Sequence, residues 1–146
     1  MKKSIIHGVL AGIASVVFFQ VMYMIDSHWF IDYKLKLASV LLFLPFMSRA
    51  AAEPAMEDVK KGIRAAFLVF IVGNGIYYLY YYFQFNVFDT DLLTLLKEEM
   101  VRYGGVKMEQ LEDYSVLPQE VFFLFIRSLI GGFVLSSLVA VVLSRA

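Results

Sequence analysis

Residues 65–88 read AAFLVFIVGNGIYYLYYYFQFNVF, a run of 24 residues without a charged side chain. An α-helix rises about 1.5 Å per residue, so about 20 apolar residues cross the roughly 30 Å hydrocarbon core of a bilayer. This stretch is therefore predicted to be a membrane-spanning helix. The composition agrees, because 60% of the chain is hydrophobic and 18% is charged, whereas soluble domains average about 45–50% and about 25%.

Two more stretches predict spans of the same kind. Residues 4–25 contain no charge, and residues 121–144 are interrupted only by Arg127. Ser115 and Pro118 precede the second stretch, and a hydroxyl followed by an early proline is typical of a helix start. Both stretches are therefore expected to be long helices that cross the membrane.

A fourth candidate span is shorter. Leu37–Ser48 holds only 12 charge-free residues, a length that by itself indicates a re-entrant or interfacial segment. Lys34 and Lys36 before it and Arg49 after it can extend their charged ends to the interface, which lengthens the usable span. Pro45 inside it predicts a kink. With this extension we expect the segment to cross the membrane.

These stretches predict an all-α fold, an integral membrane four-helix bundle that forms a single domain over residues 1–146. The expected spans are about residues 4–26, 34–52, 64–87 and 119–144. Between the last two, residues 89–117 predict a short amphipathic helical hairpin, because apolar residues recur there at helical spacing. The pair Gly104-Gly105 is expected to end its first helix with a left-handed cap, before a second short helix over residues 107–114.

The charges divide unequally between the two ends of the predicted bundle. The end with both termini holds seven basic and three acidic residues, a net charge of +4: Lys2, Lys3, Arg49, Lys60, Lys61, Arg64 and Arg145 against Glu53, Glu57 and Asp58. The opposite end holds five basic and ten acidic residues, a net charge of −5. Basic residues concentrate on the cytoplasmic side of membrane proteins, so both termini are predicted to be cytoplasmic. A re-entrant second segment would move the C-terminus to the other side.

Arg127 is the first candidate for a functional residue, because a charge inside a span is costly and often functional. Helical side chains lean toward the helix N-terminus, where lipid phosphate, Asp26 or Glu120 could meet it. The interpretation we favour is a structural or lipid anchor, and the alternative is a ligand-binding or coupling role. Asn74 and Gln20 are the other mid-span polar residues, for which hydrogen bonds between helices are weighed against a shared site with Arg127.

Small residues recur along two of the spans. In the last span Ser128, Gly132, Ser136, Ala140 and Ser144 stand four apart, and the first span holds Gly8, Gly12 and Ser15. Such stripes let helix backbones approach closely. We expect the first and fourth spans to pair through them, with a partner protein as the alternative.

Aromatic residues cluster near the ends of the spans away from the termini. The cluster comprises Tyr77, Tyr78, Tyr80, Tyr81 and Tyr82, with His28, Trp29 and Tyr33. Tyrosine and tryptophan are enriched at membrane–water interfaces, so these residues predict an aromatic belt. Stacking on a sugar or isoprenoid ligand is the alternative.

Several kinds of chemistry are not expected. The chain has no cysteine, and its two histidines, His7 and His28, lie at opposite ends of the first span. No metal-ligand, phosphate-loop or nucleophile motif occurs, so we expect neither enzyme activity nor a cofactor. A net charge of zero gives no basis for nucleic-acid binding.

Three stretches resemble a known family. They are the last span from Pro118 through Gly131-Gly132 to Ser144-Arg145, the segment Leu92–Tyr114, and the Lys60-Lys61-Gly62 entry to the third span. Together they resemble the bacterial family called domain of unknown function 4199. The resemblance implies a small four-span protein of the inner membrane with no established activity. It also suggests a membrane glycosyltransferase as partner, because members are often encoded near such enzymes. Arg127 matches no position of the family that we can identify.

The function we expect is that of an accessory or scaffolding subunit, which packs against another membrane protein or forms a homo-oligomer in contact with membrane lipids. The small-residue stripes and the lack of catalytic motifs favour this interpretation. The alternative is a small transporter or a lipid-headgroup-binding protein that uses Arg127 with Asn74 and Gln20.

Overall fold

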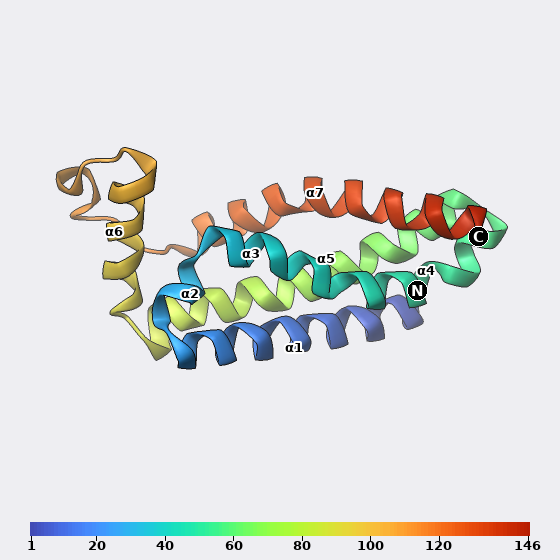
Figure 1. The fold of residues 1–146 in the computed structure, drawn as a ribbon, viewed down its shortest axis with the longest axis horizontal. Coiled ribbons are helices and arrows are strands. Elements are labelled where there is room, and N and C mark those ends of the chain that lie inside the picture. The colour runs from blue at the N-terminus through green and yellow to red at the C-terminus, as the bar shows by residue number, and fades with distance from the viewer.

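The computed structural model describes all 146 residues and contains helices and loops but no strand (Figure 1). Four helical runs are long and apolar enough to cross a membrane: α1 (Lys2–Ile25), the run Tyr33–Glu57, the run Val59–Phe88, and α7 (Pro118–Arg145). The predicted all-α fold with four candidate spans is confirmed. Both termini lie at one end of the bundle, which we call the terminal end (Figure 1).

The second run is longer than predicted. It consists of α3 (Tyr33–Ser39), a 3₁₀ segment η1 (Val40–Phe43) and α4 (Leu44–Glu57). Its 25 residues measure about 37 Å at helical rise, which is enough for a full crossing. Pro45 lies in the first turn of α4, where a missing backbone N–H breaks no helical hydrogen bond. We predicted a kink at Pro45, and the structure has a 3₁₀ segment there, directly before α4.

The third run lies at the centre of the bundle. It consists of α5 (Val59–Phe83) followed by the π-helical turn η2 (Gln84–Phe88). Helices α1, α4 and α7 all pack against α5, and Figure 1 shows α1 and α7 on opposite sides of it. The prediction that the first and fourth spans pair with each other is therefore wrong.

The small residues face α5 instead. A Cβ atom added at Gly8 would lie 2.7 Å from Val72 Cβ, and one added at Gly12 would lie 2.8 Å from Ile76 Cβ. At Gly132 an added Cβ would overlap the ring of Phe70. The stripes of α1 and α7 thus allow two close approaches to one central helix, because each glycine leaves room for a bulky α5 side chain.

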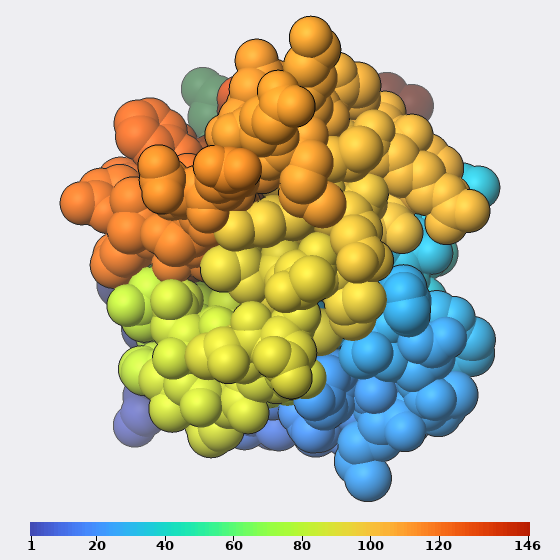
Figure 2. Space-filling view, turned by 90° about the vertical axis from the view of Figure 1, so that its left-hand side faces the viewer, coloured from blue at the N-terminus to red at the C-terminus, as the bar shows by residue number.

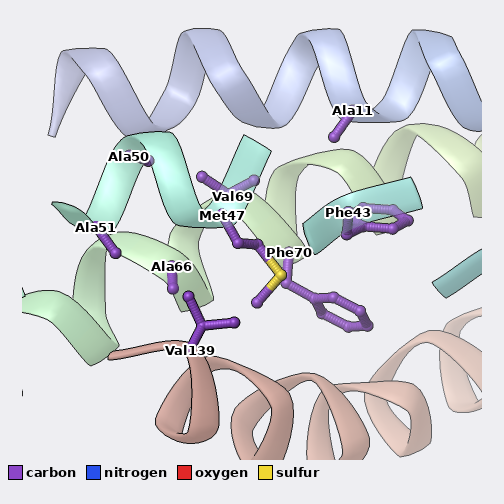
Figure 3. Packing of buried hydrophobic residues seen from close by; sticks show 9 residues of the cluster. All are labelled: Ala11, Phe43, Met47, Ala50, Ala51, Ala66, Val69, Phe70 and Val139. Atoms are coloured by element: carbon purple, nitrogen blue, oxygen red, sulfur yellow. The ribbon is translucent and has the colours of Figure 1, made fainter. Parts of the chain in front are cut away.

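The core near the terminal end is built from small and medium side chains. Its buried members are Ala11, Phe43, Met47, Ala50, Ala51, Ala66, Val69, Phe70 and Val139 (Figure 3). Four of the nine are alanines, which bring α1, α4 and α5 close together. Phe43 and Phe70 fill the space that remains, with ring centroids 5.2 Å apart.

The core at the other end is aromatic. Tyr77, Tyr78 and Tyr81 are only 5%, 8% and 5% exposed, and they lie toward one side of α5 because positions three and four residues apart share a helix face. Phe30 stacks on Tyr81 with ring centroids 5.9 Å apart. For these three tyrosines the predicted interfacial belt is wrong, since their rings pack inside the bundle.

Short elements close the end of the bundle away from the termini, which we call the capped end. They are α2 (Ser27–Ile31), α6 (Leu92–Gly104) and η3 (Met108–Leu111). Figure 1 shows α6 lying across the bundle, and Figure 2 looks onto this end, where α6 and the following loop lie beside α2. Gly105 has a φ of +66°, which confirms the predicted left-handed cap. The second short helix predicted over residues 107–114 is only the 3₁₀ turn η3.

Candidate functional site

Arg127 lies on α7 with its side chain exposed on the outside of the bundle. It takes part in none of the ion pairs of the protein. Asp26 caps α2 instead, accepting a 2.9 Å hydrogen bond from the His28 backbone N–H, and the His28 ring lies 3.0 Å away. These hydrogen bonds lower the pKa of Asp26. The guanidinium therefore faces the lipid region without an acidic partner from the chain.

Glu120 does not pair with Arg127 either. It lies in the first turn of α7, and its Oε2 atom is buried without a hydrogen-bond partner. The positive end of the helix dipole favours a carboxylate at this position. Burial raises the pKa of the nearby Tyr114 phenol to about 12, and the Glu120 carboxylate adds to this shift.

Asn74 connects α5 to α7 directly beside Arg127. Its Nδ2 atom donates a hydrogen bond of 2.5 Å to Ser128 Oγ, and that hydroxyl donates to the Phe125 carbonyl. Further along α7, Ser136 is fully buried and Ala140 faces Gly62 of α5. The polar pair therefore belongs to the same contact between α5 and α7 as the small residues.

A groove of about 470 Å³ runs between α5 and α7 at the capped half of the bundle. Its lining is mainly apolar: Gly75, Tyr78, Leu79, Tyr82, Phe83, Pro118, Val121, Phe122 and Phe125. Gly75 keeps its deep end open, because an added Cβ would meet only Phe125, at 3.8 Å. Arg127 follows two residues after Phe125, which places it about 200° around α7 from that lining residue, and it does not line the groove. The guanidinium therefore lies on the outer face of α7, level with the inner end of the groove but outside it.

Gln20 belongs to α1 and lies against a different face of α5 from the face that carries Asn74. The Tyr80 hydroxyl donates a 2.7 Å hydrogen bond to Gln20 Oε1, and the Tyr23 hydroxyl donates to Asp89 Oδ2 at 2.5 Å. These side chains border a separate cavity between α1 and the end of the third run. The structure therefore does not bring Arg127, Asn74 and Gln20 into one site.

Lys36 is a residue whose position the sequence analysis did not predict. Its ammonium group lies 4.3 Å from the ring centroid of Tyr81, 5.6 Å from that of Tyr78 and 5.9 Å from that of Tyr77. The side chain points into the bundle rather than out to the interface, so the expected extension to the interface is wrong for Lys36. The spacing of the two lysines indicates this difference. Positions 34 and 36 are about 200° apart on a helix, so both lysines cannot share an outward face.

Comparison with known proteins identifies one family. The family model described as Protein of unknown function (DUF4199) matches residues 6–145, which is nearly the entire chain. No curated protein and no solved structure shows a significant match.

Proposed function

Because the chain belongs to the family described as Protein of unknown function (DUF4199), whose description assigns no activity, we propose a function from the geometry: a lipid-binding accessory protein. In this proposal an anionic lipid lies against the outer face of α7, with its phosphate on Arg127, and the chain performs no chemistry of its own. The observation that carries the proposal is Arg127, an exposed charge within a span that has no partner in the protein.

The energetic argument begins with the guanidinium. A charge near the bilayer centre costs about 2.5–3.5 kcal/mol on insertion scales, and no carboxylate of this chain offsets that cost. A lipid phosphate would do so, because its oxygens match the guanidinium fork with two parallel hydrogen bonds. A partly desolvated pair of this kind is stronger than one in water.

The surface around Arg127 supports a lipid over a free anion. The exposed side chains near it on α7 are apolar, namely Phe123, Ile126, Ile130 and Val134, so this surface offers contacts for acyl chains and nothing for a hydrated ion. Arg127 lies nine residues after Pro118, about 13 Å along the helix axis, and its side chain leans back toward the capped end. The phosphate would therefore sit slightly deeper than the neighbouring headgroups.

The small-residue stripes, which the sequence offered as a surface for a partner protein, are used inside this chain. Gly8, Gly12 and Gly132 contact α5 of the same chain, so these residues are not free to dock a partner. A partner protein or a second copy would have to use other faces of the bundle. With the basic terminal end in the cytoplasm of a bacterial inner membrane, Arg127 would face the outer leaflet.

The test is lipid retention measured by native mass spectrometry from mild detergent. Phosphatidylglycerol is added to the wild type, to Arg127→Gln and to the control Arg64→Gln, which removes an exposed, unpaired arginine from the terminal end. We expect binding to weaken at least about tenfold in Arg127→Gln, since a charged hydrogen bond contributes about 1.5–3 kcal/mol. The control should bind like the wild type. Equal binding by all three proteins would refute the proposal.

A further inference from the structure

A second cavity lies on the other side of α5 from the groove. It has a volume of about 390 Å³ and is lined by Gln20 and Tyr23 of α1, Tyr80 of α5, and Gln84 and Phe88 of η2. This volume is within the range of about 300–1,000 Å³ typical of small-molecule sites. The cavity shares no lining residue with the groove and has none on α7, so it is independent of the lipid site proposed at Arg127.

Gln84 is the residue that indicates a ligand. It is 3% exposed and lines the cavity, yet its side-chain amide makes no hydrogen bond to the protein. The π-helical turn η2 begins at Gln84, and such turns occur frequently at functional sites. No atom of this amide is fully enclosed without a partner, so the amide opens into the cavity, and we expect its hydrogen-bond partner to be a molecule that enters there.

The hydrogen bonds around the cavity define which groups it can accept. The Tyr23 hydroxyl gives its proton to Asp89, and the Tyr80 hydroxyl gives its proton to Gln20. Both phenolic oxygens can therefore only accept from a ligand, whereas the amide N–H groups of Gln20 and Gln84 can donate. The lining thus offers donors and acceptors side by side, with no charged side chain among them.

We propose that this cavity binds a sugar. A sugar hydroxyl both donates and accepts, which matches the mixed lining, and the rings of Tyr23, Tyr80 and Phe88 offer apolar surface to its C–H faces. A phosphate is disfavoured because no cation lines the cavity and the Asp89 carboxylate lies behind Tyr23. An ammonium group is disfavoured because no carboxylate lines the cavity: Asp89 lies behind Tyr23, whose hydroxyl donates to it.

The location is consistent with two sources of the sugar. The cavity lies beside the last turns of α1, which ends at Ile25, and beside η2, which ends at Phe88. These residues mark the capped end of the spans, where lipid headgroups meet water. The ligand is therefore either the headgroup of a glycolipid or a free sugar from the aqueous side.

The test measures binding of monoglucosyl diacylglycerol in a detergent without a sugar headgroup, with free glucose as competitor. The variants are Gln84→Leu, which keeps the buried volume, Tyr80→Phe, which keeps the ring, and the control Gln119→Leu at an exposed glutamine of α7. We expect binding to weaken at least tenfold in Gln84→Leu, to weaken in Tyr80→Phe, and to be unchanged in Gln119→Leu. Melting temperatures show whether each variant is folded.

The outcomes distinguish a glycolipid headgroup from a free sugar, and they distinguish the sugar site from the lipid site at Arg127. Competition by glucose would identify a free sugar, and its absence would identify the glycolipid headgroup. Arg127→Gln should leave glucosyl-lipid binding unchanged even where phosphatidylglycerol binding is lost. The inference is overturned if folded Gln84→Leu binds like the wild type, if neither sugar binds, or if phosphatidylethanolamine displaces the glucosyl lipid.

Discussion

Among single residues, Lys36 shows how the bundle handles a charge inside its aromatic core. The ammonium lies over the rings of Tyr77, Tyr78 and Tyr81 and forms no ion pair. A cation over desolvated rings gains about 2 kcal/mol, while its removal from water costs several. The charge is therefore of little net value to stability, although the aliphatic stem fills space between α3 and α5.

Two substitutions of Lys36 separate these contributions. We expect Lys36→Met to unfold at or above the wild-type temperature, because an apolar side chain of similar length keeps the packing. We expect Lys36→Ala to be destabilised by about 2 kcal/mol or more, since truncation opens a cavity. Thermal unfolding in detergent measures both. Equal destabilisation by Met and Ala would mean that the charge itself holds the aromatic core together.

The raised pKa of Tyr114 predicts that the stability of the fold depends on pH in the alkaline range. Burial and the nearby Glu120 raise its pKa from 10.0 to about 12, so the folded protein holds the phenolic proton more tightly than the unfolded chain. This contribution to stability is present below pH 10 and is lost as the pH rises from 10 toward 12. The ultraviolet difference titration between wild type and Tyr114→Phe should therefore have its midpoint near 12. A midpoint near 10 would contradict the described environment.

The site residues were only partly predictable from the sequence. Arg127 stands out because it is the one charge in an apolar run, and the structure places it on the exposed face of α7. Gln84 and Tyr80 do not stand out, because they lie among many aromatic residues at the end of a long helix. Helical periodicity shows that Tyr77, Tyr78 and Tyr81 share a face, yet it does not show whether that face meets lipid or protein.

At the level of helices, the small residues determine how closely each span approaches its neighbour. Gly132 lies against the ring of Phe70, whereas the neighbouring Gly131 has open space where a Cβ would be. The two glycines thus form a matched pair on one helix. The sequence predicts close approach at both stripes, but a stripe carries no information about the helix that faces it, and α5 takes this place for both α1 and α7.

The pair gives a direct prediction about helix packing. Gly132→Ala should destabilise the protein by about 1–3 kcal/mol, because the added methyl overlaps the Phe70 ring and forces α7 away from α5. Gly131→Ala should be neutral or stabilising by about 0.5–1 kcal/mol, since alanine is the better helix former and meets nothing. Denaturant titration followed by circular dichroism compares the two. A Gly132→Ala variant as stable as Gly131→Ala would contradict the packing described for α5 and α7.

For the molecule as a whole, the length of the charge-free runs is sufficient to predict three spans and an all-α fold, whereas the span that contains Leu37–Ser48 is too short in charge-free residues to be predicted from length alone. The order of the helices around α5 is not predictable in the same way, because it depends on which bulky side chains enter which glycine gaps. That order has a functional consequence. It separates Arg127, on the exposed face of α7, from the cavity at Gln84, between α1 and the third run.

The central claim is that Arg127 holds an anionic lipid against the outer face of α7. Photocrosslinking with phosphatidylglycerol that carries a reactive group on its acyl chain tests this claim most directly, with the crosslinked peptides identified by mass spectrometry. The account predicts crosslinks concentrated at exposed α7 residues beyond Arg127, such as Ile130 and Val134, in the wild type and in Arg64→Gln, and their loss in Arg127→Gln. Crosslinks spread evenly around the bundle, or unchanged in Arg127→Gln, would contradict it.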